Sequence, residues 1–146
     1  MEQCIFCQII AGKVPAKKLY EDDDVVAILD IYPASAGHLL LLPKNHCQTV
    51  EELDSEIFSH MGVISQRLTV AMIANLKADG VSVIVQNGAG AEQKAPHFIM
   101  HIIPRYKDDK LQLQIPRTEV SKKEIDALYK NLKPMIEQTI SGQKLK

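Results

Sequence analysis

The sequence QNGAGAEQKAPHFIMHIIPR, residues 86–105, joins a glycine- and alanine-rich loop to an apolar run that carries two histidines. Its first half is typical of a loop, because glycine and asparagine adopt backbone conformations that other residues avoid. In residues 97–103 every side chain is apolar or histidine, which predicts a strand buried on at least one face. Pro104 is expected to end this strand or to lie at its edge, since proline has no N–H for a neighbouring strand.

The two faces of this strand differ in chemistry, because successive side chains point to opposite sides. One face is entirely apolar and suits a core: Phe98, Met100 and Ile102. The opposite face carries both histidines: His97, Ile99, His101 and Ile103. Histidines are costly to bury without polar partners, so the second face is expected to border a functional site. A pair of hydrogen-bonded core histidines is the alternative.

The order of loop, glutamine, His-x-x-x-His and Ile-Ile-Pro-Arg resembles the signature of the histidine triad (HIT) family of nucleotide-binding proteins. That family places His-x-His-x-His on one face of a strand. The outer histidines match His97 and His101, and Ile99 occupies the middle position. In the family the middle histidine is the nucleophile that attacks the α-phosphate of a nucleotide. The resemblance therefore implies a nucleotide pocket with an altered reaction centre.

Composition predicts one soluble, cytoplasmic domain of 146 residues. The formal charge of −1 argues against a broad nucleic-acid surface or a membrane-binding surface. No stretch is expected to span a membrane, and the N-terminus lacks the pattern of a signal peptide. The three cysteines suit a metal site better than a disulfide framework. Cys47 is expected to be a buried or free thiol.

A metal site is predicted around the Cys-x-x-Cys pair formed by Cys4 and Cys7, which suits a tight turn that aims two thiolates at one tetrahedral ion. A redox pair is the alternative. The resemblance implies that His46 and His97 complete a structural zinc site. His97 and His101 lie about 13 Å apart along a strand, at roughly 3.3 Å per residue, so one ion should bind only one of them.

A nucleotide site is implied by DIYPASAGHLLLLPKNH, residues 30–46, which matches the family closely. In the family's pattern Asp30 accepts hydrogen bonds from the ribose hydroxyls, and Ile28 and Ile31 line the base pocket. A turn-capping aspartate is the alternative for Asp30. His38 matches a histidine that the family places near its active site.

The loop before the histidine strand supplies further site residues. Gln86 and Gln93 fit the family's polar positions beside the phosphate, and His101 is expected to donate to the phosphate as well. Most family loops have a glycine just before the glutamine, where this chain has Glu92. A carboxylate beside a phosphate is repulsive by about a few kcal/mol when both are partly desolvated, unless it points outward.

The remaining pattern predicts short strands near residues 17–20, 25–31, 38–43 and 81–85. The main helix is predicted over residues 53–78, with Asp54 as N-cap and Gly80 as stop. Its second apolar edge fits a homodimer, which the resemblance implies: Val63, Val70 and Ile73. A capping box at Ser121 opens a C-terminal helix, which Pro134 is expected to bend or end. Residues 106–117 are predicted as an edge strand or an extended arm.

Together these elements predict an α+β fold with a mostly antiparallel sheet of about five strands, one long helix and a C-terminal helix. The HIT-like domain is expected to span residues 1–107. Residues 108–146 are expected to form an extension that belongs to the same compact unit.

Three functions fit this pattern. In the first, the protein binds a purine nucleotide, and the family's hydrolase or nucleotidyl transferase chemistry is lost or altered because Ile99 has no lone pair to attack phosphorus. In the second, it is an active hydrolase of dinucleoside polyphosphates or nucleotide phosphoramidates that uses His101 or His38. In the third, it is a zinc-stabilised dimeric interaction module.

Overall fold

The structure, a computed structural model, describes residues 4–113 and 115–142. The chain forms two compact units, Met1–Leu111 and Gln112–Lys146. In chain order the elements are α1 (Ile5–Ile10), β1 (Lys18–Glu21), β2 (Val25–Leu29), β3 (Leu39–Pro43), α2 (Ser55–Leu76), β4 (Gly80–Val85), the 3-10 helix η1 (Ala89–Ala91), β5 (Met100–Arg105) and α3 (Lys122–Gly142).

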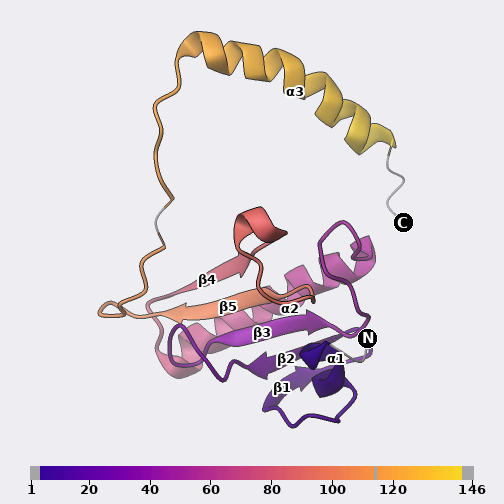
Figure 1. The fold of residues 1–146 in the computed structure, drawn as a ribbon. Helices are drawn as coiled ribbons and strands as arrows, with labels where there is room; N and C mark the ends of the chain where they lie inside the picture. Colours follow the sequence, from indigo (N-terminus) through magenta and orange to yellow (C-terminus); the bar gives the residue numbers. More distant parts are fainter. Residues whose placement is uncertain (1–3, 114, 143–146) are drawn as a thin grey trace. The chain divides into compact units, whose positions relative to one another are not determined.

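The strands of the first unit form one antiparallel sheet in the order β1-β2-β3-β5-β4. β5 lies inside the sheet, with β3 on one side and β4 on the other (Figure 1). α1 and α2 lie on opposite faces, because neighbouring residues of β2 alternate between a core cluster under α2 and a smaller cluster under α1. This architecture confirms the predicted α+β fold with a five-stranded antiparallel sheet.

The apolar face predicted for the histidine strand is the core face. Phe98, Met100 and Ile102 are each at most 5% exposed and pack in the cluster under α2. Ile99 points the other way and packs against the cluster under α1. The regular strand begins at Met100 and not at His97, because β3 pairs with β5 only as far as Met100.

Pro104 lies within β5, one residue before its end, although the strand is internal to the sheet. The pairing of β3 with β5 stops at Ile102, so no β3 partner needs an N–H from Pro104. The Ser35 hydroxyl donates instead to the Pro104 carbonyl. The nitrogen and carbonyl of one strand residue point to the same side, so the missing N–H faces this unpaired side, where its absence is tolerated.

α2 begins at the predicted cap. The Asp54 carboxylate accepts hydrogen bonds from the backbone N–H groups of Glu56 at 2.8 Å and Ile57 at 3.4 Å. The helix ends at Leu76 because Lys77 adopts a left-handed conformation with φ 56°. It therefore stops before Gly80, the residue expected to end it, and Gly80 is the first residue of β4.

α2 also has the length and mean hydropathy of a helix that could cross a membrane. Its buried side chains pack in the core cluster with the sheet: Met61, Ile64 and Met72. Packing against the sheet therefore accounts for the apolar residues on one side of α2.

The boundary between the two units falls after Leu111, four residues beyond the predicted one. The Arg105 guanidinium accounts for this extension, since it donates to both carboxylate oxygens of Asp109, at 2.7 and 2.9 Å, and to the carbonyl of Leu111. Among the described residues between β5 and α3 no strand forms, so of the two predicted alternatives, an edge strand or an extended arm, the edge strand is excluded for these residues.

The second unit contains α3, where a single compact unit was predicted for the whole chain. The predicted capping box is present, because the Glu124 carboxylate accepts from the Ser121 N–H and the Ser121 hydroxyl accepts from the Glu124 N–H. The helix continues through Pro134 to Gly142, so of the two predicted effects of Pro134, bending or ending the helix, ending is wrong. None of the residues of α3 is buried.

Candidate functional site

The two cysteines of the Cys-x-x-Cys pair are positioned by α1. Cys4 is the N-cap of this helix and Cys7 lies in its first turn. The sequence predicts a tight turn here, and the structure has a helical turn instead. Residues three apart lie on the same side of a helix, so the helical turn also brings the two sulfurs together, as the predicted tight turn would have done.

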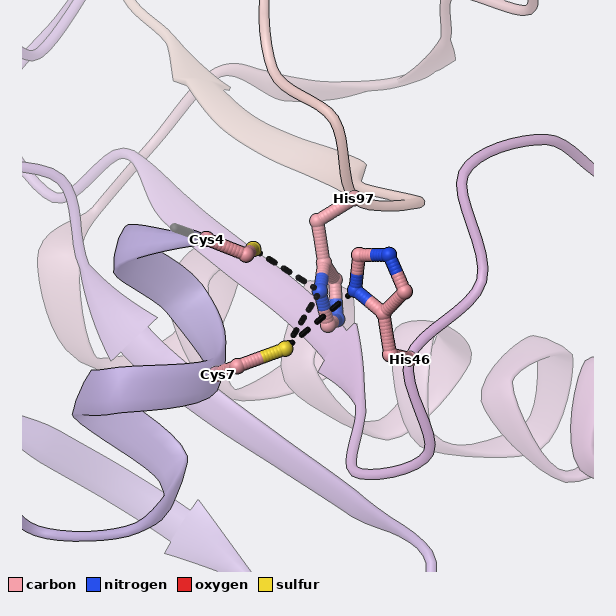
Figure 2. Close-up of side chains that lie close together, drawn as sticks. All are labelled: Cys4, Cys7, His46 and His97. Carbon is pink, nitrogen blue, oxygen red and sulfur yellow. Dashed lines mark hydrogen bonds between the residues drawn. The ribbon is translucent and has the colours of Figure 1, made fainter. Parts of the chain in front are cut away.

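Both predicted histidines meet these sulfurs (Figure 2). The Sγ of Cys7 lies 3.2 Å from Nδ1 of His46 and 3.7 Å from Nδ1 of His97. The Sγ of Cys4 lies 3.5 Å from Nδ1 of His97. Nε2 of His97 lies 3.0 Å from the Pro43 carbonyl, which can only accept a hydrogen bond. Nε2 therefore carries the proton, and the lone pair of Nδ1 faces the sulfurs.

We call Cys4, Cys7, His46 and His97 the metal clip. Its four donor atoms lie within 4.8 Å of one another. A zinc tetrahedron with bonds of about 2.0–2.3 Å has edges of about 3.3–3.8 Å, close to the sulfur–nitrogen distances above. Two thiols and two imidazoles are also the donor set of structural zinc sites. The residues present therefore fit a metal ion.

The ionisation of the clip supports the same fit. Burial, followed by the hydrogen bond and charge of Cys4, raises the pKa of the Cys7 thiol, so that thiol stays protonated until a cation replaces the proton. Burial lowers the pKa of His97, which keeps its ring neutral as a ligand must be. Cys47, the third cysteine, is buried and is not part of the clip.

Beside the clip is a pocket of about 430 Å³. One wall is formed by His97 and Ile99, just before β5, and by His101 within it, and the loops after β2 and before β5 form others. Its lining combines polar and apolar side chains: Phe6, Asp30, Tyr32, Leu40, Gln86, Gln93, Lys94, Ala95, His97, Ile99 and His101. The structure thus brings Asp30, Gln86, Gln93 and His101 into one cavity, together with Ile99.

His101 and His38 are hydrogen-bonded to each other, with Nδ1 of His101 3.0 Å from Nε2 of His38. The Ala34 N–H donates to Nδ1 of His38 at 3.1 Å, so the proton of neutral His38 is on Nε2. Nδ1 of His101 then accepts a hydrogen bond from the Nε2–H of His38. The proton of neutral His101 is therefore on its own Nε2. This chain of bonds makes His101 a donor towards a ligand.

Asp30 makes the turn-capping bond that was the alternative prediction for it, and it also lines the pocket. One carboxylate oxygen accepts from the Tyr32 N–H at 2.9 Å, which is a turn-capping bond, and the other lies 3.4 Å from Nδ1 of His38. The carboxylate is only partly buried and lines the pocket. It can therefore accept hydrogen bonds from a ligand as well.

The two glutamines differ in what they offer a ligand. The Gln93 amide is used within its loop: its oxygen accepts from the Gly88 N–H at 2.8 Å, and its nitrogen donates to the Gln48 carbonyl at 2.7 Å. Gln93 therefore shapes the loop. No hydrogen bond to a described residue occupies the Gln86 amide, which leaves it available to a ligand.

Glu92 is exposed and is not among the residues that line the pocket. Its backbone is left-handed, with φ 62°. Glycine adopts this conformation without strain, which gives a physical reason for the family's preference at this position. Because Glu92 does not line the pocket, its carboxylate is not placed to repel a phosphate bound there.

Two predicted base-pocket residues lie elsewhere. Ile28 is buried in the cluster under α1, and Ile31 is 80% exposed in the loop after β2; neither lines the pocket.

Several lining residues were not predicted: Phe6, Tyr32, Leu40, Lys94 and Ala95. Phe6 stands between the two cysteines and Lys94 directly follows Gln93, so their neighbours in sequence are the one signal that could have identified them.

The histidine pair predicts a pH dependence of stability. Burial is the largest cause that lowers the pKa of His38 and of His101 below the ordinary 6.5. Below pH 6.5 the unfolded chain takes up protons that the folded site refuses, so the free energy of unfolding should fall as the pH drops towards the folded pKa values. In His101→Gln, which lacks one of the two imidazoles, the free energy of unfolding should fall less steeply between pH 7.5 and 5, as measured by urea unfolding. The prediction would be contradicted if the free energy of unfolding depended on pH in the same way in the wild type and in this variant.

Comparison with known proteins places the chain in a family. A model of the HIT domain matches residues 11–108. The chain is 38% identical over 131 residues to an uncharacterized HIT-like protein of Methanocaldococcus jannaschii, covering 89% of this chain and 98% of the relative. It is 41% identical over 106 residues to an adenylylsulfatase of Arabidopsis thaliana, covering 73% of this chain and 54% of the relative. The crystal structure of a zinc-bound histidine triad family protein from Mycobacterium smegmatis is 31% identical, with a TM-score of 0.73 over 94% of this chain and 98% of that one. The chain is therefore a member of the HIT domain family.

Proposed function

We propose that this protein binds a purine nucleotide in the pocket beside the metal clip and that the family's nucleophilic chemistry is lost or greatly slowed. Proteins of the HIT family bind nucleotides, and some are nucleotide hydrolases. The observation that carries the proposal is the pocket lining, where ligand-binding groups surround Ile99. Asp30 suits ribose hydroxyls, while Lys94 and the N–H of His101 suit a phosphate.

The reaction centre is where the chain departs from that chemistry. Attack on phosphorus needs a lone pair aimed at it, and Ile99 has none. The adjacent His101 does not replace it, since its Nδ1 accepts the hydrogen bond of His38 and its Nε2 carries a proton. A protonated ring nitrogen binds a phosphate oxygen but does not attack phosphorus.

Calorimetry with adenosine monophosphate tests the binding. Asp30→Ala should weaken binding about tenfold or more, because a hydrogen bond to a charged group contributes roughly 1.5 kcal/mol. Asp23→Ala is the matched control, since Asp23 is an exposed carboxylate in the turn at the opposite end of β2, outside the pocket. Absence of binding to the wild-type protein at millimolar nucleotide would contradict the proposal and favour the interaction module.

A second candidate is an active hydrolase, favoured by the bond between His38 and His101. Two linked imidazoles can move a proton to a leaving group, which typically contributes a factor of about 10²–10⁴ to a rate. The substrates to test are dinucleoside polyphosphates and nucleotide phosphoramidates. Brisk turnover by the wild-type protein that His101→Asn abolishes would establish this function in place of the first.

Zinc and a cytoplasmic setting belong to the proposal. The clip's donor atoms, and the zinc-bound relative that shares the fold, support zinc as the ion. Its chemistry there would be structural, because four protein ligands leave no open position for a substrate. The three free cysteines fit a reducing compartment such as the cytoplasm.

A homodimer through α2 is also proposed. The outer side of α2 exposes Val63, Val70 and Ile73, and the neighbouring edge strand β4 exposes Val83. Exposed apolar patches mark interaction sites, and a two-fold axis lets the same patch of two subunits meet.

Val70→Glu should convert the dimer to a monomer, because it places a charge in the middle of this apolar surface at 63% exposure in the single chain. Light scattering coupled to size exclusion measures the mass. Asn75→Glu, which adds the same charge at another exposed position of α2, should remain dimeric. A monomeric wild-type protein, or an unchanged mass for Val70→Glu, would contradict the interface.

A further inference from the structure

Phe6 connects the metal clip to the pocket. It lies between Cys4 and Cys7 in α1, and its side chain lines the pocket. Its ring centre is 5.9 Å from that of His97. His97 also lines the pocket while its Nδ1 faces the two sulfurs. Part of the pocket wall is therefore made of a clip ligand and of the residue between two clip ligands.

Apart from the clip, α1 is held by the packing of Ile9, Phe6 and Ile10 in the cluster on its face of the sheet. The helix is six residues long, the side chain of its N-cap residue makes no capping hydrogen bond to the helix, and within its fully described length Ile9 alone is buried. A helix this short is not stable by itself, because nucleation costs more than a few hydrogen bonds return. The clip ties its first turn to the loop that holds His46 and to the segment that holds His97 (Figure 2). An ion bound there would fix the position of Phe6.

We propose that the clip and the pocket are energetically coupled through Phe6, so that a bound metal ion strengthens nucleotide binding and a bound nucleotide strengthens metal retention. This inference rests on the proposed nucleotide binding. Phe6 acts as a positioning residue, since it holds one wall of the pocket where the clip sets it. Coupling is reciprocal by thermodynamic necessity, so the two affinities must change by the same factor. Couplings between sites are typically about 5- to 150-fold, and we expect about tenfold here.

The experiment uses the full chain under reducing conditions. Calorimetry compares the affinity for adenosine monophosphate of zinc-loaded and chelator-stripped protein. Competition with a chromophoric chelator compares the affinity for zinc with and without saturating adenosine monophosphate. Both measurements should change by the same factor of about ten. A factor of one in either would overturn the proposal, as would failure of the clip to bind zinc.

Phe6→Ala removes the side chain that is proposed to couple the two sites and keeps all four ligands of the clip. Because Phe6 is not a ligand, the variant should bind one zinc ion with wild-type affinity in the absence of nucleotide. Its coupling factor should fall below about twofold, and zinc-loaded Phe6→Ala should bind the nucleotide more weakly than wild type does. Ile5→Ala is the control, since Ile5 is the preceding residue of α1, is 48% exposed and does not line the pocket. It should keep the full coupling.

The outcomes separate this inference from the function on which it rests. Zinc-loaded wild-type protein that binds no nucleotide would end the proposed function. Nucleotide binding that is equal in zinc-loaded wild type and Phe6→Ala would end this inference and leave the function intact. Should the stripped protein unfold, the zinc-loaded comparison of wild type with Phe6→Ala still decides between these results.

Discussion

Ile99→His is expected to raise the hydrolysis of adenosine 5′-phosphoramidate by at least about a hundredfold, since even a displacement of about 1 Å from productive geometry costs that much and wild type has no nucleophile at all. The variant places an imidazole between His97 and His101 on the pocket side of the histidine segment. The measurement is release of adenosine monophosphate under saturating substrate.

Ile99→Asn is the matched control for that gain. It adds polarity and similar bulk at the same position but no nucleophilic nitrogen, so its rate should stay at the wild-type level. Ile99 also packs against the cluster under α1, and both variants should lose some stability. An Ile99→His protein that is folded, binds the nucleotide and gains no activity would show that the pocket has lost the geometry of catalysis as well as the nucleophile.

Removal of the metal clip should produce the largest loss of stability. Cys4→Ser with Cys7→Ser removes both sulfurs, and the ion with them. With free zinc about a thousandfold above its dissociation constant, the lost stabilisation is about 4 kcal/mol, which corresponds to a fall in Tm of roughly 10 °C for a chain of this size. Calorimetric unfolding measures the fall in Tm, and elemental analysis of the same sample measures the loss of zinc.

Cys47→Ser is the control for the loss of a cysteine as such. Cys47 is buried near the clip but contributes no donor atom to it, so this variant should keep one zinc ion per chain. A stoichiometric zinc signal that survives in the double serine variant would refute the assigned ligands. An unchanged Tm in that variant would refute the stabilising role of the ion.

Alternation along the histidine segment is the feature that the sequence predicts best. A period of two is sufficient to assign Phe98 and Met100 to the core and Ile99 to the opposite side, because the residues just before β5 keep the alternation of a strand. The separation of His97 from His101 is equally predictable from chain length. The structure assigns them to different places, His97 to the clip and His101 to a bond with His38.

Local features that depend on tertiary contacts were harder to predict. α1 was missed because six residues are too few to show a helical period, and its stability depends on the sheet beneath it. Ile31 was predicted to line the pocket, yet it follows the end of β2, where the alternation that orients Ile28 no longer applies. Phe6 and Lys94 line one pocket from distant parts of the chain, and no local pattern carries that information.

The central claim is that this pocket holds a nucleotide without attacking its phosphorus. The most direct test is a single turnover, with protein in excess over radiolabelled adenosine 5′-phosphoramidate, quenched in acid at times from milliseconds to minutes. The account predicts that the protein captures the nucleotide and that the label is recovered as intact substrate. Rapid release of adenosine monophosphate, with label trapped on a side chain through a phosphorus bond, would contradict it.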